Sequence, residues 1–121
     1  MRVKDAVGRF GEQVAADRLR EAGLSIVARN WRCRDGELDI VARDGACLVF
    51  VEVKTRSSRA YGDPAEAVGA SKAARIRRLA LRWIEDNRAP DWFWESIRFD
   101  VVTVVRRPAG RPEVAHLRGA F

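Results

Sequence analysis

The sequence has 121 residues, which fits one domain and leaves little room for a second. Lys and Arg number 23 against 17 Asp and Glu, and the net charge of +6 favours a polyanionic partner such as nucleic acid, with a merely soluble basic protein as an equal alternative on composition alone. There is no apolar run long enough to span a membrane, and two cysteines with one histidine are too few for a four-ligand zinc site. The first residues are charged where a signal peptide needs an apolar run, so we expect a cytoplasmic protein with free thiols and no membrane contact.

The pattern of apolar residues predicts helices and strands in an order typical of an α/β protein. Apolar residues recur at helical spacing over residues 4–22, and Gly23 ends this first helix. Strands are predicted over residues 24–31, 37–43 and 46–54, with a hairpin turn at Asp44-Gly45. A polar loop follows, a helix start is expected at Asp63-Pro64, and a longer helix covers residues 71–87. A strand over 98–105 and a weak edge strand over 113–117 complete a mixed sheet flanked by helices.

The predicted hairpin brings two carboxylates and a lysine together. If Asp44-Gly45 is the two-residue turn, Asp39 lies opposite Phe50 and diagonal to Glu52, with about 7–8 Å between Cα atoms. Because side chains alternate along a strand, Asp39, Glu52 and Lys54 then share one face. Two carboxylates at this spacing can hold one hard cation. The alternative is that Glu52 and Lys54 form the solvated end of a strand, but the residues before them are apolar on both faces, as in a buried strand.

These residues carry a resemblance to known nucleases. Asp39, followed by Glu52-x-Lys54 on the next strand, resembles the PD-(D/E)XK signature, with Leu38 in place of the proline. Glu12 matches the additional acidic residue of the archaeal Holliday-junction resolvases in that superfamily. The sequence is also similar, nearly throughout and in order, to the bacterial YraN family, in Gly11-Glu12-x-x-Ala15, Arg29-Asn30-x-Arg32, Gly36-Glu37-Leu38-Asp39-Ile40-Val41, Phe50-Val51-Glu52-Val53-Lys54-Thr55-Arg56, Gly62-x-Pro64-x-Glu66-Ala67-Val68, Lys72 and Arg98-Phe99-Asp100-Val101-Val102.

The resemblance implies a single PD-(D/E)XK nuclease-like domain over residues 1–121, with a restriction-endonuclease-like αβββαβ core. It further implies a phosphodiesterase that acts on DNA more than on RNA, with branched DNA as one substrate. Asp39 and Glu52 would hold Mg²⁺ or Mn²⁺, helped by the Val53 carbonyl, and Glu12 would reach the metal directly or through water. Lys54 would position the nucleophile or stabilise charge on the phosphate. The similarity to the resolvases is also compatible with a homodimer.

Other acids and aromatic residues keep more than one interpretation. From its local sequence alone, Glu12 is as compatible with an exposed helix position as with a cleft. Glu37 either binds metal or pairs with a neighbouring arginine, and Asp100 is interpreted as structural because it alternates out of phase with its apolar neighbours. Trp92-Phe93-Trp94 could stack on bases, but such a cluster more often covers the edge of a core or a dimer interface.

A basic surface is predicted beside this site. In the helix over residues 71–87, Arg75, Arg78 and Arg82 form a stripe largely opposite the apolar residues. We interpret these three, together with Arg56, Arg59 and Lys72, as phosphate contacts, and the alternative is a solvated face. Two further classes of protein stay open: a nucleic-acid-binding module that keeps the nuclease fold without catalysis, and an interaction protein whose acids anchor loops.

Overall fold

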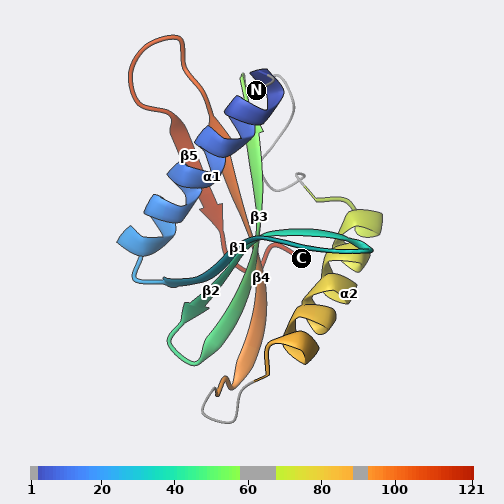
Figure 1. The fold of residues 1–121 in the computed structure, drawn as a ribbon. Helices are drawn as coiled ribbons and strands as arrows, with labels where there is room; N and C mark the ends of the chain where they lie inside the picture. The colour runs from blue at the N-terminus through green and yellow to red at the C-terminus, as the bar shows by residue number, and fades with distance from the viewer. Residues whose placement is uncertain (1–2, 58–67, 89–92) are drawn as a thin grey trace.

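The structure is a computed structural model that describes residues 3–57, 68–88 and 93–121 (Figure 1). The elements in chain order are α1 (Val3–Glu21), β1 (Ser25–Cys33), β2 (Gly36–Asp44), β3 (Cys47–Arg56), α2 (Ala70–Asp86), β4 (Ser96–Val105) and β5 (Glu113–Leu117). This order confirms the expected αβββαβ core, to which β5 adds the predicted edge strand. The helix start predicted at Asp63-Pro64 lies outside the described residues. In the described part of the chain, none of the helices has the length and apolar character needed to cross a membrane.

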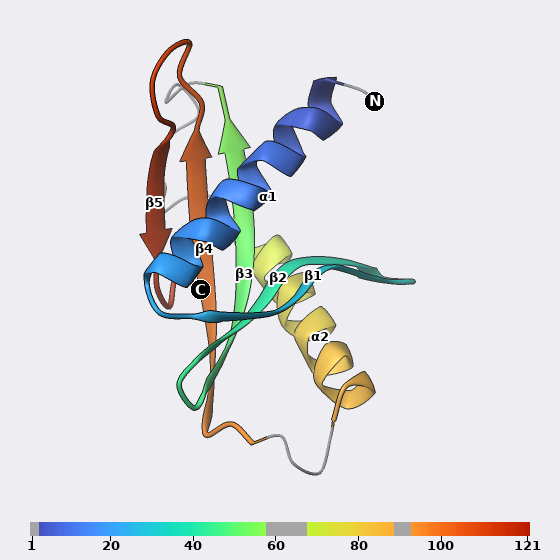
Figure 2. The same ribbon diagram turned by 60° about the vertical axis from the view of Figure 1, so that its left-hand side comes forward.

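The five strands form one mixed sheet in the order β1-β2-β3-β4-β5. All neighbouring pairs are antiparallel except β3 and β4, which run parallel because the chain crosses over through α2 between them. Helix α1 lies on one face of the sheet and α2 on the other (Figure 2). Strand β3 is therefore covered on both faces, which explains why consecutive residues of its central part are all apolar.

Each face of the sheet has its own hydrophobic cluster. Ala15, Ala16 and Leu19 of α1 pack on even-numbered residues of β2 and odd-numbered residues of β3, such as Ile40 and Val51. On the other face, the buried side of α2 packs on Phe50, Val41 and Leu38. This burial confirms the predicted apolar face of α2, which consists of Ile76, Leu79, Ala80 and Trp83. Leu38 and Ile40 belong to opposite faces, so the regular alternation of β2 breaks at Asp39.

The hairpin between β2 and β3 turns one residue later than predicted. Asp44 pairs with Cys47, so the two turn residues are Gly45-Ala46, and the turn predicted at Asp44-Gly45 is wrong. Gly45 takes the left-handed conformation, with φ of 60°, while Asp44 stays in the strand and accepts a hydrogen bond of 3.0 Å from Arg98. The last pair of this ladder is Ile40 with Val51. Asp39 and Glu52 are the next residues of the two strands, just beyond this last pair.

Candidate active site

Helix α1 presents Glu12 to a cleft because the preceding residue is a glycine. A Cβ atom on Gly11 would overlap with Thr55 Oγ1, so only glycine lets the helix approach β3 this closely. Gly8, three residues earlier in the helix, has open space where a Cβ atom would lie and lines the cleft. The cleft has a volume of about 710 Å³, and its lining brings together Glu12, Asp39, Val53, Lys54, Thr55, Arg56, Ser57 and Arg106.

Asp39 lies where β2 and β3 stop pairing. Its Oδ2 accepts a hydrogen bond of 2.9 Å from the Val53 backbone N–H, so the carboxylate replaces a missing ladder contact. Burial, followed by the nearby charge of Glu52, raises the pKa of Asp39 to about 7, and the charges of Glu12 and Glu37 act in the same direction. The Val53 hydrogen bond opposes this rise without overcoming it. Four acids therefore act on one another electrostatically around this point of the sheet.

Glu52 projects from β3 and is held by two lysines. Its Oε1 lies 2.6 Å from Lys72 Nζ and 3.5 Å from Lys54 Nζ, and the residue is only 8% exposed. Burial and the adjacent Lys72 lower the pKa of Lys54. Burial would also lower the pKa of Lys72, but the contacts with Glu52 and Lys54 outweigh it and raise that pKa. Lys72 is thus the firmly charged partner of Glu52, and Lys54 is the lysine that gives up a proton more readily.

The sequence did not identify this role of Lys72, which it assigned to phosphate binding. Apart from its place in a family motif, the sequence offers only the position of Lys72 in the first turn of α2. The ion pair between them depends on how α2 docks on the sheet, and no local pattern fixes that docking.

Asn30 connects the strand β1 to the acids. Its backbone has φ of 54°, a left-handed conformation that is uncommon for a residue other than glycine. Arg29 pairs with Ile40 and Trp31 with Leu38, so Asn30 lies across from Asp39. With the amide oriented so that its nitrogen faces the acids, this nitrogen lies 3.1 Å from Glu12 Oε2 and 3.2 Å from Glu37 Oε1. In the sequence, Asn30 stands out only as part of a family motif, and no residue pattern predicts its left-handed backbone.

Two further contacts lie beside these acids. Arg29 Nη1 donates a hydrogen bond of 3.1 Å to Gln13 Oε1, which ties β1 to α1 beside Glu12. Glu37 Oε2 lies 3.3 Å from Arg32 Nε, so of the two interpretations of Glu37 the arginine pairing is present. Burial raises the pKa of Glu12, which is one more mark of a carboxylate withdrawn from water at the cleft.

The donor set fits a hard divalent cation held by few protein ligands. Among the described residues, no three Asp, Glu, His or Cys side chains converge as a ready metal site. Mg²⁺, however, commonly uses one or two carboxylates and fills its remaining positions with water and substrate phosphate. The carboxylate of Asp39 is withdrawn from water beside other acids and accepts a hydrogen bond from the Val53 N–H. Asp39 and Glu52 are therefore the residues that would hold such an ion, with Glu12 close to it.

The predicted arginine stripe (Arg75, Arg78 and Arg82) is exposed on α2, as expected from the helical pattern. Asp35 of the β1–β2 turn joins all three in lining a shallow hollow of about 220 Å³. Arg56 lines the cleft with the acids, whereas Arg59 lies outside the described residues. Of the aromatic cluster, Trp94 packs against the α2 side of the core and Phe93 is 68% exposed, while Trp92 lies outside the described residues.

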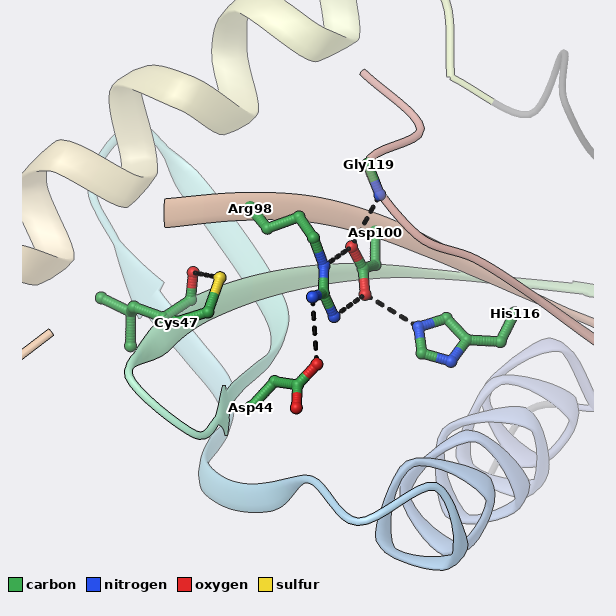
Figure 3. A network of polar contacts seen from close by, with 7 residues as sticks. Asp44, Cys47, Arg98, Asp100, His116 and Gly119 are labelled. Atoms are coloured by element: carbon green, nitrogen blue, oxygen red, sulfur yellow. Dashed lines mark hydrogen bonds and ion pairs between the residues drawn. The ribbon is translucent and has the colours of Figure 1, made fainter. Parts of the chain in front are cut away.

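Asp100 belongs to a separate network of polar contacts (Figure 3). It is fully buried and accepts hydrogen bonds from Arg98 (Nε 2.8 Å, Nη2 3.0 Å), His116 Nε2 (2.8 Å) and the Gly119 N–H (3.0 Å). Burial alone would raise the pKa of Asp100, but His116, Arg98 and Gly119 together lower it to about 2. Arg98 also reaches Asp44, so the network joins β4 to β5, the C-terminal turn and the hairpin. These contacts confirm the structural interpretation of Asp100.

Comparisons with known proteins identify the family. Residues 11–104 match the uncharacterised protein family UPF0102. A UPF0102 protein of Frankia alni is 61% identical over 122 residues, covering all of this chain and 98% of the relative. UPF0102 proteins of Beutenbergia cavernae and Nocardia farcinica are 58% and 54% identical, and each alignment covers 98% of this chain and 98% and 91% of the relative. These matches confirm the resemblance to the YraN family that the motifs carried, and the chain belongs to the uncharacterised protein family UPF0102.

Proposed function

We propose that this protein is a cytoplasmic, metal-dependent nuclease that hydrolyses phosphodiester bonds in DNA. The observation that carries the proposal is the contrast between its two buried aspartates. Asp100 is neutralised by Arg98 and has three hydrogen-bonding neighbours, and its pKa is low. Asp39 has the Val53 N–H, lies near other acids, and its pKa is raised to about 7. A carboxylate in such a position is costly to keep charged unless a cation binds beside it.

The chain's own residues divide into ligands and groups that act on the phosphate. Asp39 and Glu52 would hold the metal, and Glu12, oriented by Asn30, would adjust its position. When bound, a divalent ion would polarise the phosphate and make a bound water more acidic. Lys54 lines the same cleft, where its ammonium would position the nucleophile or stabilise the charge that develops on the phosphate. Lys72 neutralises Glu52 in this structure, and its ammonium would bind a substrate phosphate if Glu52 held a metal instead.

The basic residues around the cleft support a polyanionic substrate. Arg56 lines the cleft itself, and the arginine stripe forms a second exposed group of positive charges on α2. Contacts to phosphates would give affinity without sequence preference. Substrates with branches are included in the proposal because the family motifs resemble those of the resolvases.

A binding module without catalysis is the second candidate, and one observation favours it. The ion pair of 2.6 Å between Lys72 and Glu52 already neutralises one of the two primary ligands. If this pair persists with DNA bound, Glu52 is not free for a metal, and the cleft serves only to bind phosphates.

Cleavage assays on a panel of substrates separate the two candidates. Linear, nicked, flapped and four-way-branched DNA, with matched RNA, are incubated with wild type and variants in Mg²⁺, Mn²⁺ or EDTA. We expect metal-dependent cleavage of DNA by wild type and by Glu85→Gln, a control at an exposed position of α2. Asp39→Asn and Glu52→Gln should lose both metal binding, measured by calorimetry, and cleavage.

The remaining variants test the separate roles of the lysine and the helix acid. Lys54→Ala should keep its metal affinity and lose about 10²–10³ in rate, the scale of a group that stabilises transition-state charge. Glu12→Ala should lie between these cases, because it tunes the metal rather than holding it. Cleavage that persists in EDTA or in Glu52→Gln would indicate a contaminant. A wild type that binds DNA but cleaves none of the substrates would establish the binding module.

A further inference from the structure

A second hollow continues the cleft along the first turns of α1. Its volume is about 430 Å³, and its lining includes Phe10, Arg106, Arg107 and Pro112. Val7 and Arg106 line both hollows, so the two form one groove that begins at the acids and ends at the β4–β5 connection. The first turns of α1 lie beside the C-terminal end of β3 and this connection (Figure 1). None of the described residues that line the second hollow is acidic.

Arg106 lines both hollows, and Phe10 lies beside it in the second. The Arg106 guanidinium carbon lies 5.7 Å from the centroid of the Phe10 ring, and Phe10 is 40% exposed. The backbone N–H of Arg106 donates a hydrogen bond of 2.8 Å to the Arg56 carbonyl, which fixes the end of β4 beside the end of β3. A cation and a flat apolar surface are therefore held together beside the end of β3, the strand that carries Lys54 and Arg56.

This pairing matches the two chemical features of a polynucleotide strand. A guanidinium binds backbone phosphates, and an aromatic ring or the guanidinium plane offers a surface on which a base can stack. A base is available for such stacking only when it is not paired and stacked within a duplex. The surface therefore distinguishes single-stranded segments from continuous duplex, which the arginine stripe on α2 does not do.

We propose that the groove from the cleft past Arg106 and Phe10 binds a single-stranded segment of DNA next to the bond that is cut. Arg106 contacts a phosphate, Phe10 supports an unpaired base, and Arg107 adds positive charge at the far end. This inference rests on the proposed function in taking DNA as the partner, and it narrows the substrate to DNA with an unpaired strand beside the scissile bond.

Binding measured in EDTA tests the groove without any need for cleavage. Fluorescence anisotropy compares a labelled 20-nucleotide single strand with a 20-base-pair blunt duplex over a range of salt concentrations. Arg106→Ala should weaken binding of the single strand and reduce the slope of log affinity against log salt by about 0.7, the value for one phosphate contact. Phe10→Leu should weaken the same binding by about 5- to 100-fold through lost stacking. It should leave the slope unchanged because it removes no charge, and Phe10→Tyr should restore affinity.

The control is Arg18→Ala, which removes one charge from an exposed position farther along the same helix. The proposal is overturned if Arg106→Ala and Phe10→Leu behave like this control, or if they weaken duplex and single strand equally. Circular dichroism of each variant identifies one that has simply unfolded, and Phe10→Tyr then provides the test, because it must bind like wild type. If wild type cleaves no substrate but Arg106→Ala and Phe10→Leu weaken single-strand binding as expected, the nuclease proposal is rejected and the groove is kept. If wild type cleaves DNA but both variants bind the single strand like wild type, the groove is rejected and the nuclease proposal is kept.

Discussion

Replacing Asp39 with asparagine should stabilise the metal-free protein by an amount that depends on pH. Burial and the charge of Glu52 raise the pKa of Asp39 from 3.8 to about 7. A carboxyl group with a raised folded-state pKa stabilises the fold fully below its unfolded-state pKa, and this contribution is lost as pH rises through the folded-state value. Each tenfold change in proton affinity is worth about 1.4 kcal/mol, so the contribution lost between about pH 4 and pH 7 is about 4 kcal/mol at most.

Urea denaturation in EDTA measures this effect directly. The free energy of unfolding is compared at pH 5 and pH 8 for wild type, Asp39→Asn and the exposed control Glu85→Gln. Asparagine keeps an oxygen that can accept the Val53 hydrogen bond, so the packing is changed little. The stability of Asp39→Asn relative to wild type should therefore rise by about 2–3 kcal/mol between the two pH values. The control should show no such change.

Adding 10 mM Mg²⁺ at pH 8 gives the second half of the test. Wild type should gain stability as the ion binds the folded state, and Asp39→Asn should gain little. If wild type and Asp39→Asn show the same pH dependence, Asp39 ionises like an exposed acid and the electrostatic argument for the site is refuted. If Mg²⁺ stabilises both proteins equally, the ion binds elsewhere.

Three further predictions concern other parts of the molecule. Asp100→Asn should cost about 3–5 kcal/mol of stability at pH 7, because it removes the buried charge partner of Arg98 and leaves Arg98 only the partly exposed Asp44. This loss, measured by urea denaturation, should shrink as pH falls from about 4 toward 2, because Asp100 then becomes protonated in the folded protein as well. Asn30→Gly should raise stability by about 1 kcal/mol, since glycine adopts φ of 54° without strain, yet slow cleavage at least about tenfold by releasing Glu12; unchanged cleavage would show that the amide does not position Glu12. Replacing all three residues of the arginine stripe with alanine should lower the salt slope for duplex binding by about 2.7, and an unchanged slope would identify a solvated face.

Much of the fold could be predicted because its signals are local. Apolar spacing located both described helices and all five strands, and the edge strand was placed over the residues it occupies, Glu113–Leu117. The faces of α2 followed from the same spacing, because a helix that covers a sheet must bury its apolar side. Periodicity works best for the two helices, because each of them buries a single side against the sheet.

The turn of the hairpin and the partners of the acids could not be predicted in the same way. Asp44-Gly45 and Gly45-Ala46 both place glycine in a turn, and the choice is tied to the contact between Asp44 and Arg98, which are far apart in the sequence. The partner of Glu52 likewise comes from another element, since Lys72 reaches it only after α2 has docked. The candidate ligands were found because their residue types are conspicuous, whereas their environment is a product of tertiary structure.

Three unusual structural features lie together around Glu12 and Asp39. Helix α1 approaches β3 so closely at Gly11 that no side chain fits, Asn30 holds a left-handed backbone without being glycine, and Asp39 is withdrawn from water beside other acids. The strain at Asn30 and the buried charge of Asp39 each cost free energy, and a single substitution, to glycine or to asparagine, would relieve each of them. At Asp100, by contrast, the cost of burying a carboxylate is offset by hydrogen bonds from Arg98, His116 and Gly119. Costs that coincide at one cleft, and that a cation and a phosphate would offset, are better explained by binding and chemistry than by folding.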